Sequence, residues 1–273
     1  MSEREVIERT PEPNTVGTLS RDLAALGVEP GMLLLVHSSL SALGWTVGGA
    51  VTVVLALEAA VRAYGTLIMP TQSGDLSDPE EWEHPPVPRA WWETIRREMP
   101  AFHPEMTPSR GMGAVPECFR TQPGVVRSVH PHDSFAAWGE HAVEICSDHE
   151  LDFGLGEGSP LRRIYDHDGW VLLLGCGFES NTSFHLAEYR ADYGRKEVVW
   201  RYAPIEVDGH RRWKQFRDIN IDSDDFVELG RDFHKQRSAD VREGRVGGAN
   251  ALLFPQRSCV DYAVRWLRRH RAA

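Results

Sequence analysis

Two short, uninterrupted apolar runs joined by a helical pattern constrain the fold of this chain more than any other feature. Residues 32–37 read Met-Leu-Leu-Leu-Val-His, and residues 66–70 read Thr-Leu-Ile-Met-Pro. Apolar side chains recur at helical spacing over residues 53–64, and Gly65 ends that pattern. Because neither run alternates with polar residues, we expect two strands covered on both faces, as in parallel sheets. Together the three segments predict a right-handed βαβ unit.

The remaining segments continue this alternation and predict an α/β fold with helices on both faces of a mixed sheet. A chain of this length can form it as a single domain over residues 1–273 or as two closely packed subdomains. Residues 1–14 are predicted to form a flexible tail. Residues 71–113 hold seven prolines and three tryptophans, which predicts an ordered insertion with one short helix over residues 91–99. Before the βαβ unit we expect a helix with apolar residues spaced from Leu19 to Val28 and closed by Gly27, and within the unit a loop over 38–49 between the first strand and its helix. In the middle of the chain we expect a strand over 134–138, a helix over 140–149, a helix over 161–166 that begins at Ser159 and Pro160, and a strand over 171–174. Towards the end we expect a hairpin of 198–207 and 211–216 with its turn at Asp208 and Gly209, a helix capped by Asp222, a strand over 246–254 and a helix over 258–271.

Charge and composition exclude some classes of function. The formal net charge of −10 argues against a nucleic-acid-binding protein and favours a cationic ligand. No apolar run is long enough to span a membrane, and residues 1–13 lack the apolar core of a signal peptide. We therefore expect a cytoplasmic protein that binds neither nucleic acid nor membrane. The four cysteines have no paired spacing and are expected to be reduced thiols; they are Cys118, Cys146, Cys176 and Cys259.

The strongest candidate for chemistry is a polar segment that follows the predicted strand 171–174. Asn181, Thr182 and Ser183 lead into a helix that carries His185 and Glu188. Residues three apart share one face of a helix, so the carboxylate can orient the imidazole or balance its charge. An ion pair on a solvated helix surface would show the same spacing, and both interpretations stay open.

Three other segments carry polar side chains near predicted strand ends. Ser38 and Ser39 follow the first strand, and Gly48 and Gly49 lead into the next helix, where backbone N–H groups can bind an anion. An ordinary strand-to-helix loop would look the same. His37 ends the first strand, where it either lines a crevice or belongs to the core. The run from Arg127 to Ser134 could hold phosphates; its histidines also permit a metal site, although no further ligand set is recognisable.

The sequence lacks the usual signals of covalent catalysis. No Gly-X-Ser-X-Gly elbow occurs, and no cysteine lies in a motif that favours a thiolate. A histidine base that activates the nucleophile of a substrate needs only the groups already described. Acyl transfer from a thioester to an amine fits that set of groups.

Taken together, these segments resemble the aminoglycoside 3-N-acetyltransferase family of antibiotic N-acetyltransferases. The resemblance extends in order from about Leu19 to Phe254. The matching pieces are Val-His-Ser-Ser at 36–39, Met-Pro-Thr-Gln-Ser at 69–73, Arg-Ser-Val-His-Pro at 127–131, Ser-Pro at 159–160, Leu-Leu-Leu-Gly at 172–175 and Asn-Thr-Ser at 181–183 with His185, Ala187 and Glu188.

The resemblance implies a three-layer α/β/α sandwich distinct from the GNAT fold, and transfer of an acetyl group from acetyl-CoA to the 3-amino group of 2-deoxystreptamine in aminoglycoside antibiotics. It implies that His185, assisted by Glu188, is the general base of a ternary-complex mechanism, with His37 close to the acetyl group. Asp75 and Asn181 would contact the polycationic substrate, the former against its sugar rings, and residues 71–113 would form the acceptor side. No metal is implied. The implied acetyl-CoA contacts are Ser38, Ser39, Val47, Gly48, Gly49, Arg127, Ser128 and Ser134.

Two other functions remain open at this stage. One is acetyl-CoA-dependent N-acylation of another small amine, outside antibiotic resistance. The other is a metal-dependent hydrolase that uses His37, His130, His132 and His185. The sequence is compatible with a monomer or a homodimer.

Overall fold

A seven-stranded mixed sheet forms the centre of the computed structural model, which describes residues 2–194 and 196–272 of the 273 in the sequence. Strands β2, β1 and β5 are parallel neighbours, and the strands on either side of them run antiparallel. In spatial order the strands are β3 (Val126–Arg127), β4 (Phe135–Gly139), β2 (Thr66–Pro70), β1 (Leu33–Ser38), β5 (Trp170–Leu174), β9 (Ala249–Pro255) and β8 (Arg242–Val246).

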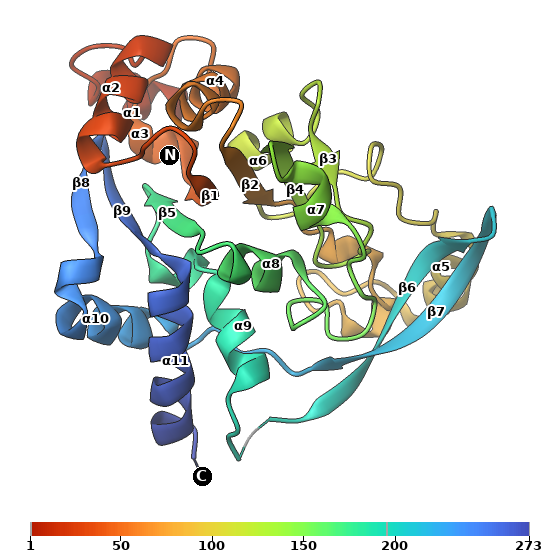
Figure 1. Ribbon diagram of the computed structural model, residues 1–273. Coiled ribbons are helices and arrows are strands. Elements are labelled where there is room, and N and C mark those ends of the chain that lie inside the picture. The colour runs from red at the N-terminus through yellow and green to blue at the C-terminus, as the bar shows by residue number, and fades with distance from the viewer. Residues whose placement is uncertain (1, 195, 273) are drawn as a thin grey trace.

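Helices cover both faces of this sheet, as expected (Figure 1). Leu34 and Val36 of β1 face one apolar layer, and Leu33 and Leu35 face the other, because successive side chains of a strand point to opposite faces. The first layer contains α2 (Val16–Leu26), α4 (Ala50–Val61) and α6 (Ala114–Phe119); the second contains α7 (Ala142–Cys146), α8 (Pro160–Asp166), α9 (Ser183–Arg190), α10 (Phe226–Gln236) and α11 (Gln256–His270). The prediction of a three-layer α/β/α sandwich is confirmed.

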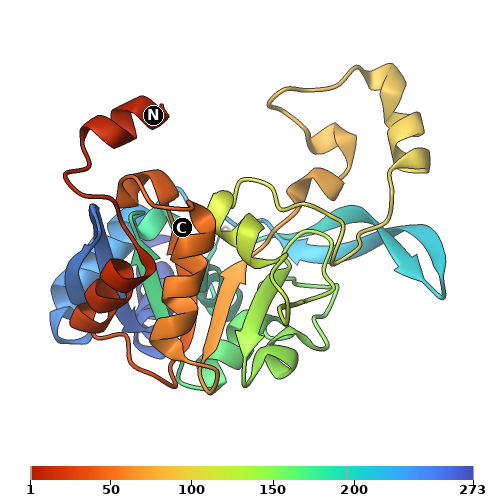
Figure 2. The same ribbon diagram turned by 90° about the horizontal axis from the view of Figure 1, so that it is seen from above.

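An arm, made of residues 71–113 and the hairpin of β6 (Val198–Val207) and β7 (His210–Ile219), extends to one side of the sheet (Figure 2). The backbone N–H of Phe102 donates to the carbonyl of Pro204 at 3.0 Å, and Arg211 Nε donates to the carbonyl of Met99 at 2.6 Å. These bonds hold the proline-rich insertion against the hairpin. The insertion contains α5 (Trp92–Glu98) and the short 3₁₀ helices η1 (Gly74–Leu76), η2 (Pro79–Glu81) and η3 (Arg89–Trp91).

The structure departs from the sequence expectations at several places. The strand predicted over 246–254 is present as β9, but it begins three residues later than expected, because Gly247, with φ +55°, and Gly248 form a tight turn. The strand before that turn, β8, was not predicted. Asp222 does not cap α10, which begins at Phe226 after Asp225. Within residues 1–14, expected as a flexible tail, α1 (Glu3–Glu8) forms behind a capping box on Ser2.

Two smaller features complete the fold. Helix α3 (Leu40–Leu43) lies within the predicted loop over 38–49, and the short 3₁₀ helices η4 (Phe178–Ser180) and η5 (Ser238–Asp240) precede α9 and β8. None of the helices that the structure describes combines the length and apolar character needed to cross a membrane.

Candidate active site

A cavity of about 260 Å³ opens at the carboxyl edge of the three parallel strands, and we call it the edge cavity. His37 and Ser38 from the end of β1, and Pro70 from the end of β2, line it, together with His185 on α9. Ligands of open α/β sheets bind at this edge, because the loops that follow parallel strands meet there. The other lining residues are Gln72, Gly111, Met112, Pro116, Cys176, Glu179, Ser180, Asn181, Thr182 and Ser223.

His185 and Glu188 form the predicted pair on one face of α9. Nδ1 of His185 lies 2.6 Å from Oε2 of Glu188. The Glu188 side chain is fully buried, whereas 14% of the His185 side chain is exposed. A carboxylate at Nδ1 favours the tautomer with its proton on that nitrogen, which leaves Nε2 able to accept a proton. The pair thus has the arrangement of a general base and the group that orients it.

Arg271 completes this arrangement from beyond the end of α11. Its Nη1 donates to Oε1 of Glu188 at 2.6 Å, and its Nε donates to Oδ2 of Asp225 at 2.7 Å. The backbone N–H of Asp222 also donates to Oε1 of Glu188, at 3.0 Å. Burial opposes the charge of Arg271, but the hydrogen bonds to Asp225 and Glu188 outweigh it and raise its pKa. Glu188 is therefore fixed on both oxygens, one by His185 and one by Arg271.

The side chain of Asn181 forms hydrogen bonds at the start of α9. Its Oδ1 accepts the backbone N–H of Ser183 at 3.2 Å, and its Nδ2 donates to Sγ of Cys259 at 3.3 Å. The Asn181 side chain is fully buried, although the residue lines the edge cavity. These bonds fix the start of the helix that carries His185.

His37 is a buried, neutral histidine beside the pair. Its Nε2 lies 3.3 Å from Oγ1 of Thr182. Burial, with a smaller contribution from the charge of His185, lowers the pKa of His37 to about 3. The ring therefore stays uncharged at neutral pH and can take part in a hydrogen bond in the edge cavity.

The low pKa of His37 predicts that acid destabilises the protein. Between pH 6.5 and about 3 the unfolded chain protonates this ring while the folded chain does not. The free energy of unfolding therefore falls with decreasing pH in that range, by up to about 1.4 kcal/mol per pH unit from this group. Urea unfolding across that range should give a shallower pH dependence for His37→Asn than for the wild type. Equal slopes would contradict the assignment, and His210→Ala, at an exposed position, should keep the wild-type slope.

Ser38 places a hydroxyl group at the edge cavity. Its Oγ is buried and has no hydrogen-bond partner among the described residues. A buried hydroxyl without a partner is costly unless a ligand satisfies it. Oγ of its neighbour Ser39 lies 3.4 Å from Oγ of Ser41, and the Ser39 backbone N–H donates to the carbonyl of Leu174.

The turn of Val47, Gly48 and Gly49 lies at the N-terminus of α4, outside the lining of the edge cavity. Gly48 and Gly49 have φ of +74° and +61°, which favour glycine. The Val47 residue is 46% exposed. The backbone N–H groups of Val47 and Gly49 already donate to the carbonyls of Asn14 and Thr46. What this turn can offer a ligand is therefore the exposed Val47 side chain and the first N–H groups of α4, which lack partners within the helix.

The structure does not bring Arg127, Ser128 and Ser134 to the edge cavity. All three are buried. Arg127 Nε donates to Oγ of Ser134 and to Oγ1 of Thr71, both at 3.1 Å, and Nη1 donates to the carbonyl of Pro104 at 3.1 Å. Burial, aided by the charge of a nearby arginine, lowers the pKa of Arg127 to about 10. Arg127, predicted to contact a phosphate, thus uses its guanidinium to hold the insertion against the sheet through these hydrogen bonds.

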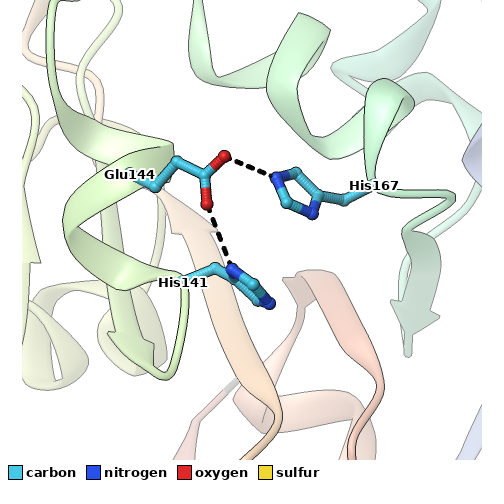
Figure 3. Close-up of side chains that lie close together, drawn as sticks. All are labelled: His141, Glu144 and His167. Atoms are coloured by element: carbon cyan, nitrogen blue, oxygen red, sulfur yellow. Dashed lines mark hydrogen bonds and ion pairs between the residues drawn. The ribbon is translucent and has the colours of Figure 1, made fainter.

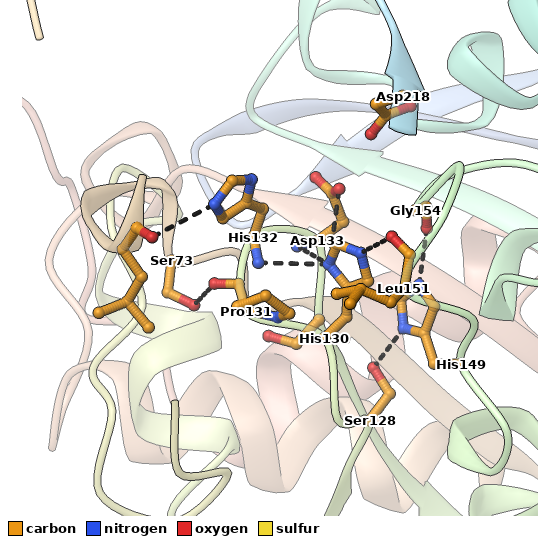
Figure 4. A network of polar contacts seen from close by, with 12 residues as sticks. Ser73, Ser128, His130, Pro131, His132, Asp133, His149, Leu151, Gly154 and Asp218 are labelled. Atoms are coloured by element: carbon orange, nitrogen blue, oxygen red, sulfur yellow. Dashed lines mark hydrogen bonds and ion pairs between the residues drawn. The ribbon is translucent and has the colours of Figure 1, made fainter. Parts of the chain in front are cut away.

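The histidines near this segment belong to a buried network around His130 (Figure 4). Nδ1 of His130 accepts the backbone N–H groups of Asp133 at 2.8 Å and His132 at 3.2 Å. Nδ1 of His149 lies 2.9 Å from Oγ of Ser128, which also accepts a backbone N–H. Burial lowers the pKa of His130 to about 4. The imidazoles satisfy buried loop atoms here.

The four histidines of the hydrolase alternative do not form a metal-binding group. Among the described residues, the one set of three or more potential ligands close enough to share an ion is His141, Glu144 and His167. That set contains none of those four histidines. The geometry therefore favours a histidine base over a metal-activated water at the edge cavity.

A second cavity, of about 330 Å³, lies between the arm and the loop of His132 and Asp133, and we call it the arm cavity. It shares Gln72 with the edge cavity. Burial raises the pKa of Asp133, and burial together with the charge of Asp133 raises the pKa of Asp218 to about 6. Asp75, predicted as a substrate contact, is exposed on η1 nearby, 3.1 Å from Nη1 of Arg110. The other residues that line the arm cavity are Gly74, Ser77, Glu81, Arg110, Arg201, Ile219 and Ile221.

Comparison with known proteins shows which family has this arrangement. Residues 35–268 match the family model described as aminoglycoside 3-N-acetyltransferase. The chain belongs to the aminoglycoside 3-N-acetyltransferase family. The resemblance inferred from the sequence is thereby confirmed, and the chain is an acyltransferase of this family.

Individual members of the aminoglycoside 3-N-acetyltransferase family match almost the whole chain. The SPbeta prophage-derived aminoglycoside N(3')-acetyltransferase-like protein YokD of Bacillus subtilis is 47% identical, and the match covers 96% of each chain. Its crystal structure has a TM-score of 0.95 at 46% identity, with 98% of each chain covered. Aminoglycoside N(3)-acetyltransferase VIII of Streptomyces fradiae is 40% identical over 98% of this chain and 96% of its own.

Two solved structures of this family are complexes with a ligand. A structure of AAC-IIIb binary with CoASH has a TM-score of 0.84 at 30% identity, and covers 96% of this chain and 99% of its own. A structure of AAC-VIa bound to sisomicin has a TM-score of 0.85 at 32% identity, and covers 96% and 100%. The fold of this chain is therefore the same as that of both structures.

Proposed function

We propose that this protein transfers the acetyl group of acetyl-CoA to the 3-amino group of the 2-deoxystreptamine ring of aminoglycoside antibiotics, and so confers resistance. The observation that carries the proposal is the pair of His185 and Glu188, with Arg271 behind it, at the cavity where the parallel strands end. Family membership supplies the reaction class. We place the protein in the cytoplasm with its donor, which is consistent with four free cysteines.

In the proposed mechanism, the substrate amine and acetyl-CoA bind together and react directly. The amine nitrogen attacks the thioester carbonyl while Nε2 of His185 takes the proton that this nitrogen loses. The C–N bond forms, the C–S bond breaks, and the imidazolium returns the proton to the CoA thiolate. Glu188 stabilises the imidazolium, and Arg271 keeps Glu188 in place. Orientation of two bound substrates supplies much of the rate.

The tetrahedral intermediate carries a negative oxygen that requires a hydrogen-bond donor. We assign Ser38 Oγ as a candidate donor, because it is buried at the edge cavity and free of a partner among the described residues. His37 lies beside it and is neutral, so it adds no competing charge. Ser39 and the turn of Val47, Gly48 and Gly49 remain the proposed contacts of acetyl-CoA.

The acceptor side is proposed to be the arm cavity. Its carboxylates, Glu81, Asp133 and Asp218, suit a cationic amine, and the shared Gln72 connects it with the edge cavity. Asp75 stays a proposed contact at its rim. The buried amide of Asn181 contributes through the placement of α9 and through the lining of the edge cavity.

One observation favours the alternative of another small amine as acceptor. Asp75 is paired with Arg110, and Glu81 with Arg201 at 2.9 Å, so two acidic groups of the arm already have cationic partners. An acceptor with fewer positive charges than an aminoglycoside would leave these pairs intact.

The decisive test mixes the purified protein with acetyl-CoA and a panel of amines. The panel contains 2-deoxystreptamine aminoglycosides, an aminoglycoside whose 3-amino group is already acetylated, and simple diamines. We expect thiol release with the first group only, unchanged by EDTA, and a product that mass spectrometry shows to be acetylated at the 3-amino group. If no aminoglycoside causes thiol release although acetyl-CoA still binds, the proposed aminoglycoside substrate is wrong and the alternative of another small amine is supported.

A further inference from the structure

Two histidines and a glutamate lie close together at the surface of the protein (Figure 3). None of the three residues lines either of the cavities described above. Nδ1 of His141 lies 3.1 Å from Oε2 of Glu144, and Nε2 of His167 lies 2.8 Å from Oε1 of the same carboxylate. The potential ligand atoms of the three residues all lie within 4.8 Å of one another. The two imidazoles therefore converge on one carboxylate from the ends of two different helices.

The fold places these three side chains without reference to the edge cavity. His141 directly precedes α7, and its backbone N–H donates to Oγ1 of Thr66 at 3.0 Å, where β2 begins. Glu144 lies in the first turn of α7. His167 follows the last turn of α8, just before β5. The cluster thus lies at the amino edge of the parallel strands, about 17 Å from the carboxyl edge for a five-residue strand.

The chemistry of the three side chains selects a class of ligand. Their side-chain exposures are 39% for His141, 56% for Glu144 and 28% for His167, so an ion can reach them from solvent. Two imidazoles and one carboxylate are ligands typical of Zn²⁺ and related transition metals, whereas Mg²⁺ and Ca²⁺ prefer oxygen ligands.

We propose that His141, Glu144 and His167 form a binding site for a divalent transition-metal ion such as Zn²⁺, with water completing its coordination. The carboxylate of Glu144 exchanges its two hydrogen bonds to the imidazoles for a bond to the ion. All three side chains then bind the ion directly. Since Glu144 lies in α7, His141 directly precedes α7 and His167 directly follows α8, the bound ion cross-links the start of α7 with the end of α8. The site takes no part in the proposed acetyl transfer.

The helix contact that surrounds the site does not depend on these three residues alone. Arg163 of α8 donates to the backbone carbonyl of Ile145 at 3.4 Å and to that of Asp148 at 2.9 Å. Leu161 and Ile164 pack in the same apolar layer as Ile145. Variants of the three ligands are therefore expected to fold, which allows binding to be measured directly.

The test is calorimetric titration of Zn²⁺ into the full-length protein, freed of any polyhistidine tag and stripped with EDTA. We expect one ion per chain in the wild type, and affinity reduced by at least about tenfold in His141→Ala and in His167→Ala. His210→Ala, at an exposed position in the hairpin, should bind as the wild type does.

Thermal unfolding with and without Zn²⁺ gives an independent readout. The ion should raise Tm in the wild type and in His210→Ala, and should leave Tm unchanged in His141→Ala, because only a ligand bound to the native state stabilises it. Absence of Zn²⁺ binding by the wild type would overturn the proposal. Equal affinity in all three histidine variants would also overturn it, since the ion would then bind elsewhere.

Discussion

Replacement of His185 by alanine should lower kcat for acetyl transfer by about 10²- to 10⁴-fold, the usual contribution of a general base. The affinity for acetyl-CoA should change little, because Nε2 of His185 is assigned to the proton of the amine and not to the donor. Steady-state kinetics with a saturating aminoglycoside would measure the first effect, and calorimetric titration of acetyl-CoA the second. Turnover near that of the wild type would overturn the role of His185.

The matched control for this experiment is again His210→Ala, which removes an exposed imidazole from the hairpin. It should keep kcat within about twofold of the wild type, since exposed substitutions away from a site have small effects. An equal loss in both variants would indicate a general response to histidine removal. A loss in His185→Ala together with lost acetyl-CoA binding would indicate damage to the whole cavity instead of removal of a base.

Replacement of Gly230 by alanine should be among the most destabilising single-methyl changes in this protein. A Cβ atom at Gly230 would lie 2.0 Å from Cγ of Phe178, far inside van der Waals contact. The ring of Phe178 cannot easily move, because Phe184 and Phe254 lie 6.1 and 5.8 Å from it, centroid to centroid. We expect the free energy of unfolding to fall by about 2–3 kcal/mol, the upper range for an overpacked core.

Urea unfolding at neutral pH would measure this effect, and Gly17→Ala is its matched control. Gly17 is exposed in α2, and the nearest atom to an added Cβ there is Oγ1 of Thr15 at 3.9 Å. Alanine is favoured over glycine by about 0.5–1 kcal/mol inside a helix and by less in its first turn, where Gly17 lies, so this variant should be at least as stable as the wild type. Equal stability of the two variants would contradict the packing described around Phe178.

The sequence predicted the parallel centre of the sheet well because the signals there are local. The apolar runs at 32–37 and 66–70 became β1 and β2, and their pairing follows from the helix between them. His185 and Glu188 could be paired from spacing alone, since a helix brings residues three apart together. The strand predicted over 246–254 was placed three residues too early, because it included the turn at Gly247 and Gly248. Its partner β8 was missed, because the charged residues in that strand hide any apolar pattern.

The parts of the site that sequence reasoning missed depend on long-range contacts. Arg271 follows an arginine-rich stretch, and no local pattern distinguishes it as the partner of Glu188. Arg127 and Ser128 show the converse error: polar residues near a strand end predict a ligand site equally well whether they face a ligand or satisfy buried loop atoms. Only the direction of the side chain separates the two cases, and it is set by tertiary packing.

The contact between Glu188 and Arg271 also orders events during synthesis of the chain. These residues are 83 positions apart, and at bacterial or eukaryotic elongation rates of about 5–20 residues per second that separation corresponds to roughly 4–17 s. Throughout that interval His185 and Glu188 exist in the nascent polypeptide without the cation that fixes the carboxylate. A nascent chain that has folded its parallel strands therefore still lacks the contact that fixes Glu188, and the complete catalytic group forms only after α11 and Arg271 have been synthesised and have docked.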